Sequence, residues 1–238
     1  MGASQKRPRL TLLGGFELAC DGRWVTLSTS AQRLLAFVAL RERPLQRSYV
    51  AGSLWLDSPE ERAAANLRSA LWRLHGCGIQ LVHSVGSQLS LDSGVVVDLR
   101  EAERFAHRAL DPDGELDVDP SMLSGDLLPD WYDEWVVYER ERFHQLRLRA
   151  LDALCLRLAD AGHLDGALEI GLTAVADDPL RESSHRAVVR VHLADGNIAE
   201  AIRQYRLCRR LLNEQLGVRP SERMEELVRD LHAREPVR

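Results

Sequence analysis

The spacing of apolar residues changes once along this chain, near residue 97, and that change limits the folds available to it. Before it, short apolar or alternating runs are broken by turn signals such as Gly14-Gly15 and Asp21-Gly22, and they surround segments of helical spacing. After it, every periodic segment has helical spacing. We therefore predict an α+β domain over residues 1–96 and an all-α domain over residues 97–238.

The first domain is predicted to hold strands at both ends and helices between them. The predicted strands cover residues 10–13, 16–20, 24–27, 79–85 and 88–91. A first helix starts in a capping box at Thr29-Ser30-Ala31-Gln32 and ends before Pro44, and a second covers 47–55. A small sheet, helices and a closing hairpin, in this order, are typical of a winged helix-turn-helix.

A third helix has a clear start and a polar outer face. Ser58 is its predicted N-cap, Pro59 its first residue, and Gly76 its end. At about 100° per residue its leucines form one stripe, which can be buried. The remaining surface carries these polar side chains: Arg62, Asn66, Arg68, Ser69 and Arg73. Arg can bind guanine and Asn adenine, so the face is either an ordinary solvated surface or one that reads a DNA duplex.

Other residues near this helix allow two interpretations. Trp72 lies on the same outer face, and we expect it to pack under the hairpin rather than to contact a base. Arg41, Arg43 and Arg47 surround the turn between the first two helices. They are either phosphate contacts or a charge cluster that serves solubility.

The second domain is predicted to consist of helices that contain a repeat. The predicted helices cover residues 98–110, 131–160 (in one piece or two), 164–176, 182–194, 198–215 and 221–233. Residues 161–168 align with residues 195–202 at an offset of 34, which is the period of tetratricopeptide repeats. Two repeats are too few to stand alone, so we expect the neighbouring helices to cap them in one tetratricopeptide-like bundle.

Aromatic and acidic residues gather before the long helix of this domain. We expect the aromatic side chains of Trp131, Tyr132 and Trp135 to pack between helices. We expect these carboxylates to lie at the surface: Asp126, Asp130, Asp133 and Glu134. No defined ligand spacing accompanies them, so they do not indicate a cation site.

Charge is unevenly distributed between the two halves of the chain. Residues 1–97 hold 11 Lys and Arg against 7 Asp and Glu, a net charge of +4. Residues 98–238 hold 20 against 29, a net charge of −9, which together with +4 gives the total of −5. A basic front joined to an acidic remainder favours a polyanion-binding module attached to a domain of another kind.

The sequence gives no support for catalysis, cofactors or metal binding. It contains no phosphate-binding loop, no nucleophile elbow and no HExxH helix, so no catalytic residue and no cofactor is predicted. The four cysteines are widely spaced, and His75, Cys77 and His83 lack a nearby fourth ligand, so neither zinc nor a disulfide framework is expected. No apolar run is long enough to cross a membrane, and we expect a cytoplasmic protein.

Several stretches resemble the Streptomyces antibiotic regulatory protein family. They are LTLLGGFELACDGRWVTL, AQRLLAFVALRERPL, SLWLDSPEERAAANLRSALWRL, GSQLSLDSGVVVDLREAERFA, LLPDWYDEWVVYERERFHQLRLRALDAL and AIRQYRLCRRLLNEQLGVRPSERMEEL. The resemblance covers residues 10–233 in order. It implies an OmpR-type winged helix followed by a bacterial transcriptional activation domain. It also implies an activator that binds direct repeats in double-stranded promoter DNA, as a homodimer on that DNA, and recruits RNA polymerase.

The resemblance also assigns roles to particular residues. In the family the third helix reads the major groove, which here gives that role to Arg62, Asn66, Arg68, Ser69 and Arg73. The preceding turn, with Leu56, Asp57 and Ser58, takes the place where OmpR-type activators touch polymerase. The wing turn, with Ser87 and Gln88, takes the place of a further DNA contact but lacks the arginine often found there.

This sequence departs from the family pattern at other points. Gln46 stands where a serine or threonine cap is common. Nothing follows residue 238 in this sequence, so the nucleotide-binding and sensor domains of the larger relatives are not expected here. An alternative function is a protein-interaction scaffold in which the helical domain binds a partner and the winged domain docks against it.

Overall fold

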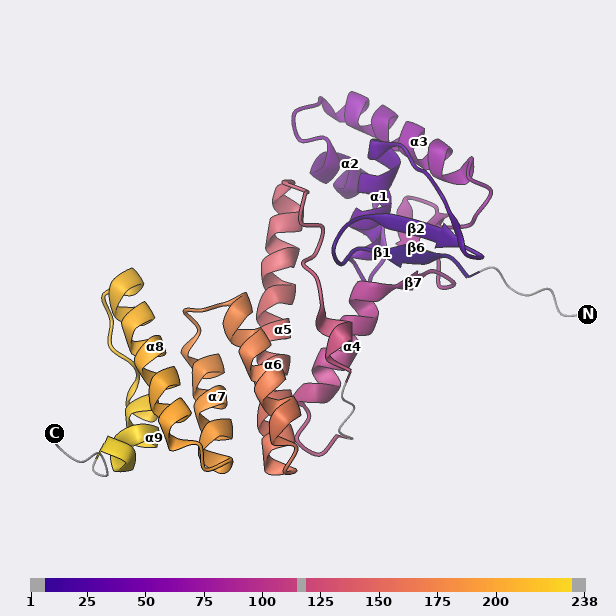
Figure 1. Cartoon of the computed structure of the whole chain (residues 1–238). Coiled ribbons are helices and arrows are strands. Elements are labelled where there is room, and N and C mark those ends of the chain that lie inside the picture. The colour runs from indigo at the N-terminus through magenta and orange to yellow at the C-terminus, as the bar shows by residue number, and fades with distance from the viewer. Residues whose placement is uncertain (1–6, 115–118, 233–238) are drawn as a thin grey trace, which may run out of the picture. The chain divides into compact units, whose positions relative to one another are not determined.

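The computed structural model describes residues 7–114 and 119–232, and its chain groups into two compact units (Figure 1). The first unit consists of Met1–Ala102 and Ser124–Phe143, and the second of Glu103–Leu123 and His144–Arg238. A segment from beyond residue 97 is thus part of the first unit, because its apolar side chains are buried there. The boundary between residues 96 and 97 stays a prediction about the functional domains.

The described strands of the first unit pair into a sheet of order β3-β2-β1-β7 and another of order β4-β6-β5. Strands β1 and β7 are parallel, and the other pairs are antiparallel. The bounds are β1 Arg9–Thr11, β2 Glu17–Cys20, β3 Arg23–Trp24, β4 Leu45–Gln46, β5 Val82–Val85, β6 Gln88–Leu91 and β7 Val96–Val97. The predicted hairpin is confirmed, although its first strand begins at Val82. The two-residue strands β4 and β7 were not predicted, since they are too short to show a period.

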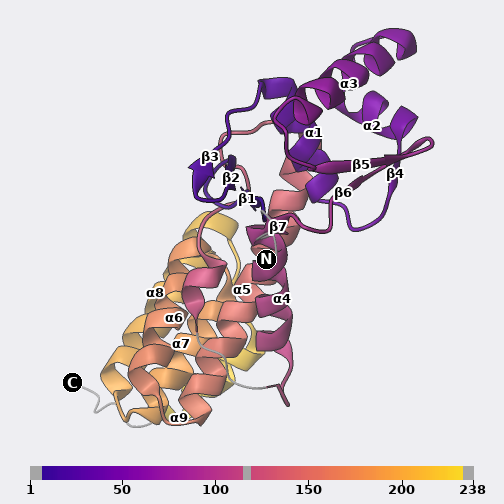
Figure 2. The same cartoon turned by 90° about the vertical axis from the view of Figure 1, so that its right-hand side faces the viewer.

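Helices α1 (Thr29–Ala39), α2 (Arg47–Leu54) and α3 (Glu60–His75) stand beside these sheets (Figure 2). The helices are confirmed, but their predicted caps are wrong. At α1, Ser28 is the N-cap and makes no side-chain cap hydrogen bond, while the Gln32 amide donates to the Leu27 carbonyl. At α3, Pro59 rather than Ser58 is the N-cap, because its ψ of 150° is extended and the helix starts only after it.

The core of the first unit joins the winged helix to the segment that contains the start of α5 (Glu134–Asp160). Phe16 stacks on Trp131 with ring centroids 5.8 Å apart, and Phe37 meets Trp135 edge-on at 5.1 Å. These two tryptophans pack against the core as predicted, whereas Tyr132 is 86% exposed and its predicted packing is wrong.

Arg140 holds the turn before α5 in place. Its guanidinium donates hydrogen bonds to the backbone carbonyls of Leu127, Leu128 and Trp131. Leu127 and Leu128 are fully buried. Three carbonyls on one guanidinium fix the path of this segment more firmly than side-chain packing alone would.

Helix α4 (Asp98–Leu110) is attached to the first sheet by its first residue. The Asp98 carboxylate accepts hydrogen bonds of 2.9 to 3.0 Å from the backbone N–H groups of Leu12 and Leu13, and one of 2.7 Å from that of Leu99. Burial raises the pKa of the Asp98 carboxyl, and these N–H groups act in the opposite direction. This side chain therefore ties the start of α4 to the two residues that follow β1.

Replacing Asp98 should destabilise the first unit. In Asp98→Ala two backbone N–H groups beside β1 lose their acceptor, so we expect the free energy of unfolding to fall by about 2–4 kcal/mol. Glu101→Ala is the control, since the Arg9–Glu101 pair is exposed and contributes at most about 1 kcal/mol. Urea titration of both variants measures the difference, and equal losses would show that Asp98 has no such role.

The second unit contains the helical repeat. Its helices are the end of α4, η1 (Pro120–Leu123), the greater part of α5, α6 (Leu164–Asp177), α7 (Glu182–Ala194), α8 (Ile198–Leu216) and α9 (Glu222–His232). Neighbours in sequence from α6 to α9 are neighbours in space (Figure 1). The predicted helices are confirmed, with α5 in one piece. Residue 233, the predicted end of the last helix, lies outside the described residues.

The turns before α6 and α8 repeat the same geometry 34 residues apart. Gly162 and Gly196 both adopt the left-handed conformation, with φ of +82° and +75°. The N–H groups that follow them, of His163 and Asn197, donate to the carbonyls of Leu158 and His192. The predicted repeat is therefore present in the backbone itself.

Buried His185 on α7 should make the second unit sensitive to acid. The side chain is fully buried, its Nε2 donates to the Pro179 carbonyl at 2.9 Å, and Nδ1 accepts from the Gln204 amide at 2.8 Å. Burial lowers the pKa of His185 from its ordinary value of 6.5. The neutral ring is thus favoured in the folded state, and stability present above pH 6.5 is lost as pH falls and the unfolded chain binds a proton.

The melting temperature between about pH 7.5 and about pH 5.5 measures this effect. We expect a steeper fall with acid for the wild-type chain than for His185→Gln, which cannot take up the proton. Exposed His163→Gln is the control and should keep the wild-type slope. A slope unchanged in His185→Gln would contradict the prediction.

Candidate nucleic-acid interface

Helix α3 presents the outer face that its sequence predicts. Leu67, Leu71 and Leu74 are 2%, 4% and 1% exposed, so this stripe is buried in the core. On the other side, Arg62, Arg68, Ser69 and Arg73 are exposed and Asn66 is half-buried. The structure therefore brings all five predicted reading residues onto the exposed side of one helix.

Few protein contacts occupy these side chains. Within the described residues Arg62, Asn66 and Arg68 have no side-chain hydrogen bond or ion pair. Arg73 donates to the Ser30 and Ser28 hydroxyls at 3.1 and 3.4 Å, and the Ser69 hydroxyl donates to the carbonyl one turn back. Three of the five can therefore engage a ligand without breaking a contact within the protein.

Trp72 does not pack under the hairpin, so the packing predicted for it is wrong. Its side chain is 76% exposed, between Arg68 and Arg73 along the outer face. The hairpin is held by other side chains, since Val82 and Leu89 are buried in the core. The helical period of α3 directs Trp72 away from this core. The sequence alone could not show whether the hairpin would cover this side chain.

The wing turn and the start of α2 come together. The Arg47 backbone N–H donates to the Ser87 carbonyl at 2.8 Å, and its guanidinium donates to the Ser84 hydroxyl at 3.1 Å. Gln46 pairs with Gln88 between β4 and β6, which gives it a role in the sheet instead of a side-chain cap. The predicted residues Arg47, Ser87 and Gln88 thus form one neighbourhood.

Arg41 and Arg43 differ in their surroundings. Arg43 is exposed. Arg41 lies 2.8 Å from Glu139 in an ion pair, and its guanidinium sits 5.1 Å from the centroid of the Phe37 ring. A phosphate contact by Arg41 would have to compete with Glu139, so the geometry favours Arg43 and Arg47 over Arg41.

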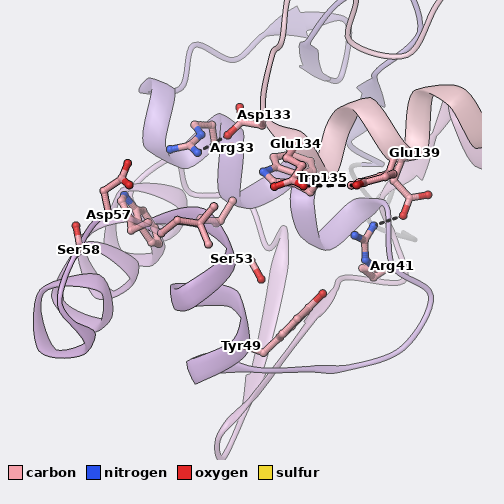
Figure 3. A pocket seen from close by; sticks show the side chains of 14 residues that line it. Arg33, Arg41, Tyr49, Ser53, Asp57, Ser58, Asp133, Glu134, Trp135 and Glu139 are labelled. Atoms are coloured by element: carbon pink, nitrogen blue, oxygen red, sulfur yellow. Dashed lines mark hydrogen bonds and ion pairs between the residues drawn. The ribbon is translucent and has the colours of Figure 1, made fainter.

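The turn between α2 and α3 lies beside the start of α5, and together they line a cavity of about 610 Å³ (Figure 3). Leu56 is 73% exposed, Asp57 is exposed and Ser58 is half-buried. The Asp133 carboxylate, which was expected at the surface, is 23% exposed and forms an ion pair with Arg33. Nothing in the sequence indicates the α5 side of this cavity, because residues that meet here are far apart along the chain, as Arg33 and Asp133 are at a separation of 100 positions.

Within the described residues the structure shows no group of three or more potential metal ligands. His83 Nε2 instead lies 2.6 Å from an Asp92 carboxylate oxygen, and all four cysteines are free. Burial raises the pKa of the Cys155 and Cys208 thiols to about 12, so both stay protonated at neutral pH. In the part of the chain that the structure describes, no helix has the length and apolar character needed to cross a bilayer.

Residues 91–232, more than half of the chain, match the family described as "Bacterial transcriptional activator domain". Together with the winged helix before it, this match identifies the class of protein. The chain belongs to the Streptomyces antibiotic regulatory protein family of transcriptional activators.

Two known proteins show how far the similarity extends. The chain is 29% identical over 245 residues to the "Regulatory protein AfsR" of Streptomyces coelicolor, covering 96% of this chain and 24% of that relative, so it spans about a quarter of that relative's length. Its fold is similar to that of Mycobacterium tuberculosis EmbR, solved in complex with a low-affinity phosphopeptide. That match has a TM-score of 0.78 and 20% identity, and it covers 98% of this chain and 67% of EmbR.

Proposed function

We propose that this protein is a sequence-specific activator that binds direct repeats in promoter DNA through α3 and recruits RNA polymerase. The observation that carries the proposal is the outer face of α3, where three arginines are exposed and Asn66 is half-buried on the side opposite the buried leucine stripe. Guanidinium and amide groups match the base edges of the major groove. Arg43, which is exposed just before β4, and Arg47, which lies beside the wing turn, supply phosphate contacts.

The same proposal assigns a role to each of the other parts of the chain. Residues 1–96 bind DNA and residues 97–238 form the activation domain. Two protomers occupy the two half-sites of a direct repeat and pair on that DNA. The turn at Leu56, Asp57 and Ser58 contacts polymerase, and the protein acts in the cytoplasm.

A titration against DNA tests the binding function. The full chain is titrated against DNA upstream of its own gene and against random DNA of equal length, at several salt concentrations. We expect a preference of about a thousandfold or more for the specific DNA, with an affinity that falls as salt rises. Equal affinity for both would contradict DNA reading and favour the scaffold function.

Trp72 is expected to contact a thymine methyl group in the same complex, since its indole is exposed beside the arginines of α3. Replacing thymine by deoxyuracil in the bound DNA removes that methyl. We expect this to weaken wild-type binding at one or two positions by about 1 kcal/mol, and to leave Trp72→Ala unaffected there. Trp24→Ala is the control, because Trp24 is 71% exposed, close to the 76% of Trp72, but lies on β3.

A further inference from the structure

The cavity between the α2–α3 turn and the start of α5 is walled by both segments within the first unit (Figure 3). Leu56, Asp57 and Ser58 come from the turn, and Glu134 and Tyr138 come from α5. We call this cavity the turn–α5 groove. The turn that we propose to contact polymerase is thus one wall of a larger surface. Residues of α5, from beyond the winged helix, form the other wall.

The turn–α5 groove is acidic after its internal ion pairs are counted. Arg33 is paired with Asp133, and Arg41 with Glu139, so both arginines of the lining are neutralised. The carboxylates of Asp57 and Glu134 remain, and neither has a cation partner among the described residues. Two arginines against four carboxylates give the lining a net charge of −2.

Apolar side chains are exposed around these carboxylates. Leu56 is 73% exposed, Tyr138 69% and Tyr49 46%, and all three line the cavity. Large exposed apolar groups that gather at one hollow mark a surface that binds another molecule. An acidic hollow repels phosphates, so the DNA duplex is excluded as the occupant.

We propose that the turn–α5 groove binds a cationic amphipathic helix of RNA polymerase, which places a bulky apolar side chain in the hollow and lysines or arginines against Asp57 and Glu134. This inference rests on the proposed function and deepens it, because it makes α5 part of the polymerase contact. The two exposed faces of the first unit then carry opposite charge: α3 is basic toward DNA, and the groove is acidic toward protein.

The test compares variants of the full chain on both walls of the groove. The α5 wall is altered by Glu134→Lys and by Tyr138→Ala, and the turn by Asp57→Lys. Matched controls are Asp130→Lys and Tyr132→Ala, since both residues are exposed just before α5 and neither lines the cavity. All five side chains are exposed, so each variant should keep the wild-type melting temperature.

Two quantities are measured for each variant. One is the affinity for DNA selected by the wild-type chain from a random-sequence pool, and the other is transcription by bacterial RNA polymerase holoenzyme from a template carrying that DNA. We expect each groove variant to lose about five- to twentyfold of the activation with DNA affinity unchanged, while the controls activate as the wild type does.

Other outcomes separate this inference from the proposed function. If Asp57→Lys loses activation but both α5 variants keep it, α5 has no part in the contact and the inference is wrong, while the proposed function stands. If the groove variants lose DNA affinity in step with activation, the groove belongs to the DNA interface and the inference is again wrong. A wild-type chain that selects no DNA, or that binds DNA without activating, would overturn both.

Discussion

A fragment that ends at residue 97 is expected to be largely unfolded, although it contains every strand and helix of the winged helix-turn-helix. The core of the first unit includes six buried side chains from beyond that point. Four of them are large and at most 3% exposed: Leu127, Leu128, Val136 and Phe143. Each contributes about 1.5–3 kcal/mol by burial, so their loss removes about 6–12 kcal/mol. A domain of this kind is stable by only about 5–15 kcal/mol in total.

Circular dichroism and urea unfolding of two fragments measure this dependence. A fragment of residues 1–143 restores the missing side chains and Asp98, and we expect it to unfold cooperatively. The fragment 1–97 should show a low helix content and no cooperative transition. A sharp transition in the shorter fragment, at the urea concentration of the longer one, would show that residues 124–143 contribute nothing to this core.

Removing two arginines from the outer face of α3 is expected to have the second large effect. Arg62 and Arg73 stand near opposite ends of the helix, so both reach into one groove only if α3 lies along it. If each touches a base, the variant Arg62→Ala/Arg73→Ala should lose about 2–6 kcal/mol of binding free energy for the selected DNA. Its affinity for random DNA should change much less.

The control for this variant removes the same charge elsewhere. Arg209→Ala/Arg210→Ala alters two exposed arginines on α8 in the second unit and should bind both DNAs as the wild type does. Anisotropy titrations at several salt concentrations distinguish the roles. An equal loss on selected and random DNA, with a shallower salt dependence, would reassign Arg62 and Arg73 to phosphate contacts.

Features encoded by local spacing could be predicted from the sequence. The leucine stripe of α3 follows from a 3.6-residue period, and the turns at Gly162 and Gly196 follow from the 34-residue repeat. Features that depend on contacts between distant residues could not. The pair between Arg33 and Asp133 joins positions 100 residues apart, and nothing near either residue indicates the other. The α5 wall of the groove was missed for this reason.

Local errors had equally specific causes. The cap of α3 was misplaced by one residue because the extended ψ of Pro59 delays the helix start. Trp72 was expected to be covered because tryptophans are usually buried, but the phase of α3 directs this one to solvent. The helical period shows that Trp72 faces outward, but it does not show whether another segment covers the side chain.

The central claim is that the outer face of α3 enters a DNA groove, and a photo-crosslinker placed at Ser69 tests it most directly. Ser69 is exposed at the middle of this face, and the matched position is exposed Tyr132 near the start of α5. On irradiation with the selected DNA, the Ser69 variant should crosslink to bases within the repeat and the Tyr132 variant should not. Crosslinks from Tyr132 to the repeat, with none from Ser69, would show that another surface reads the DNA.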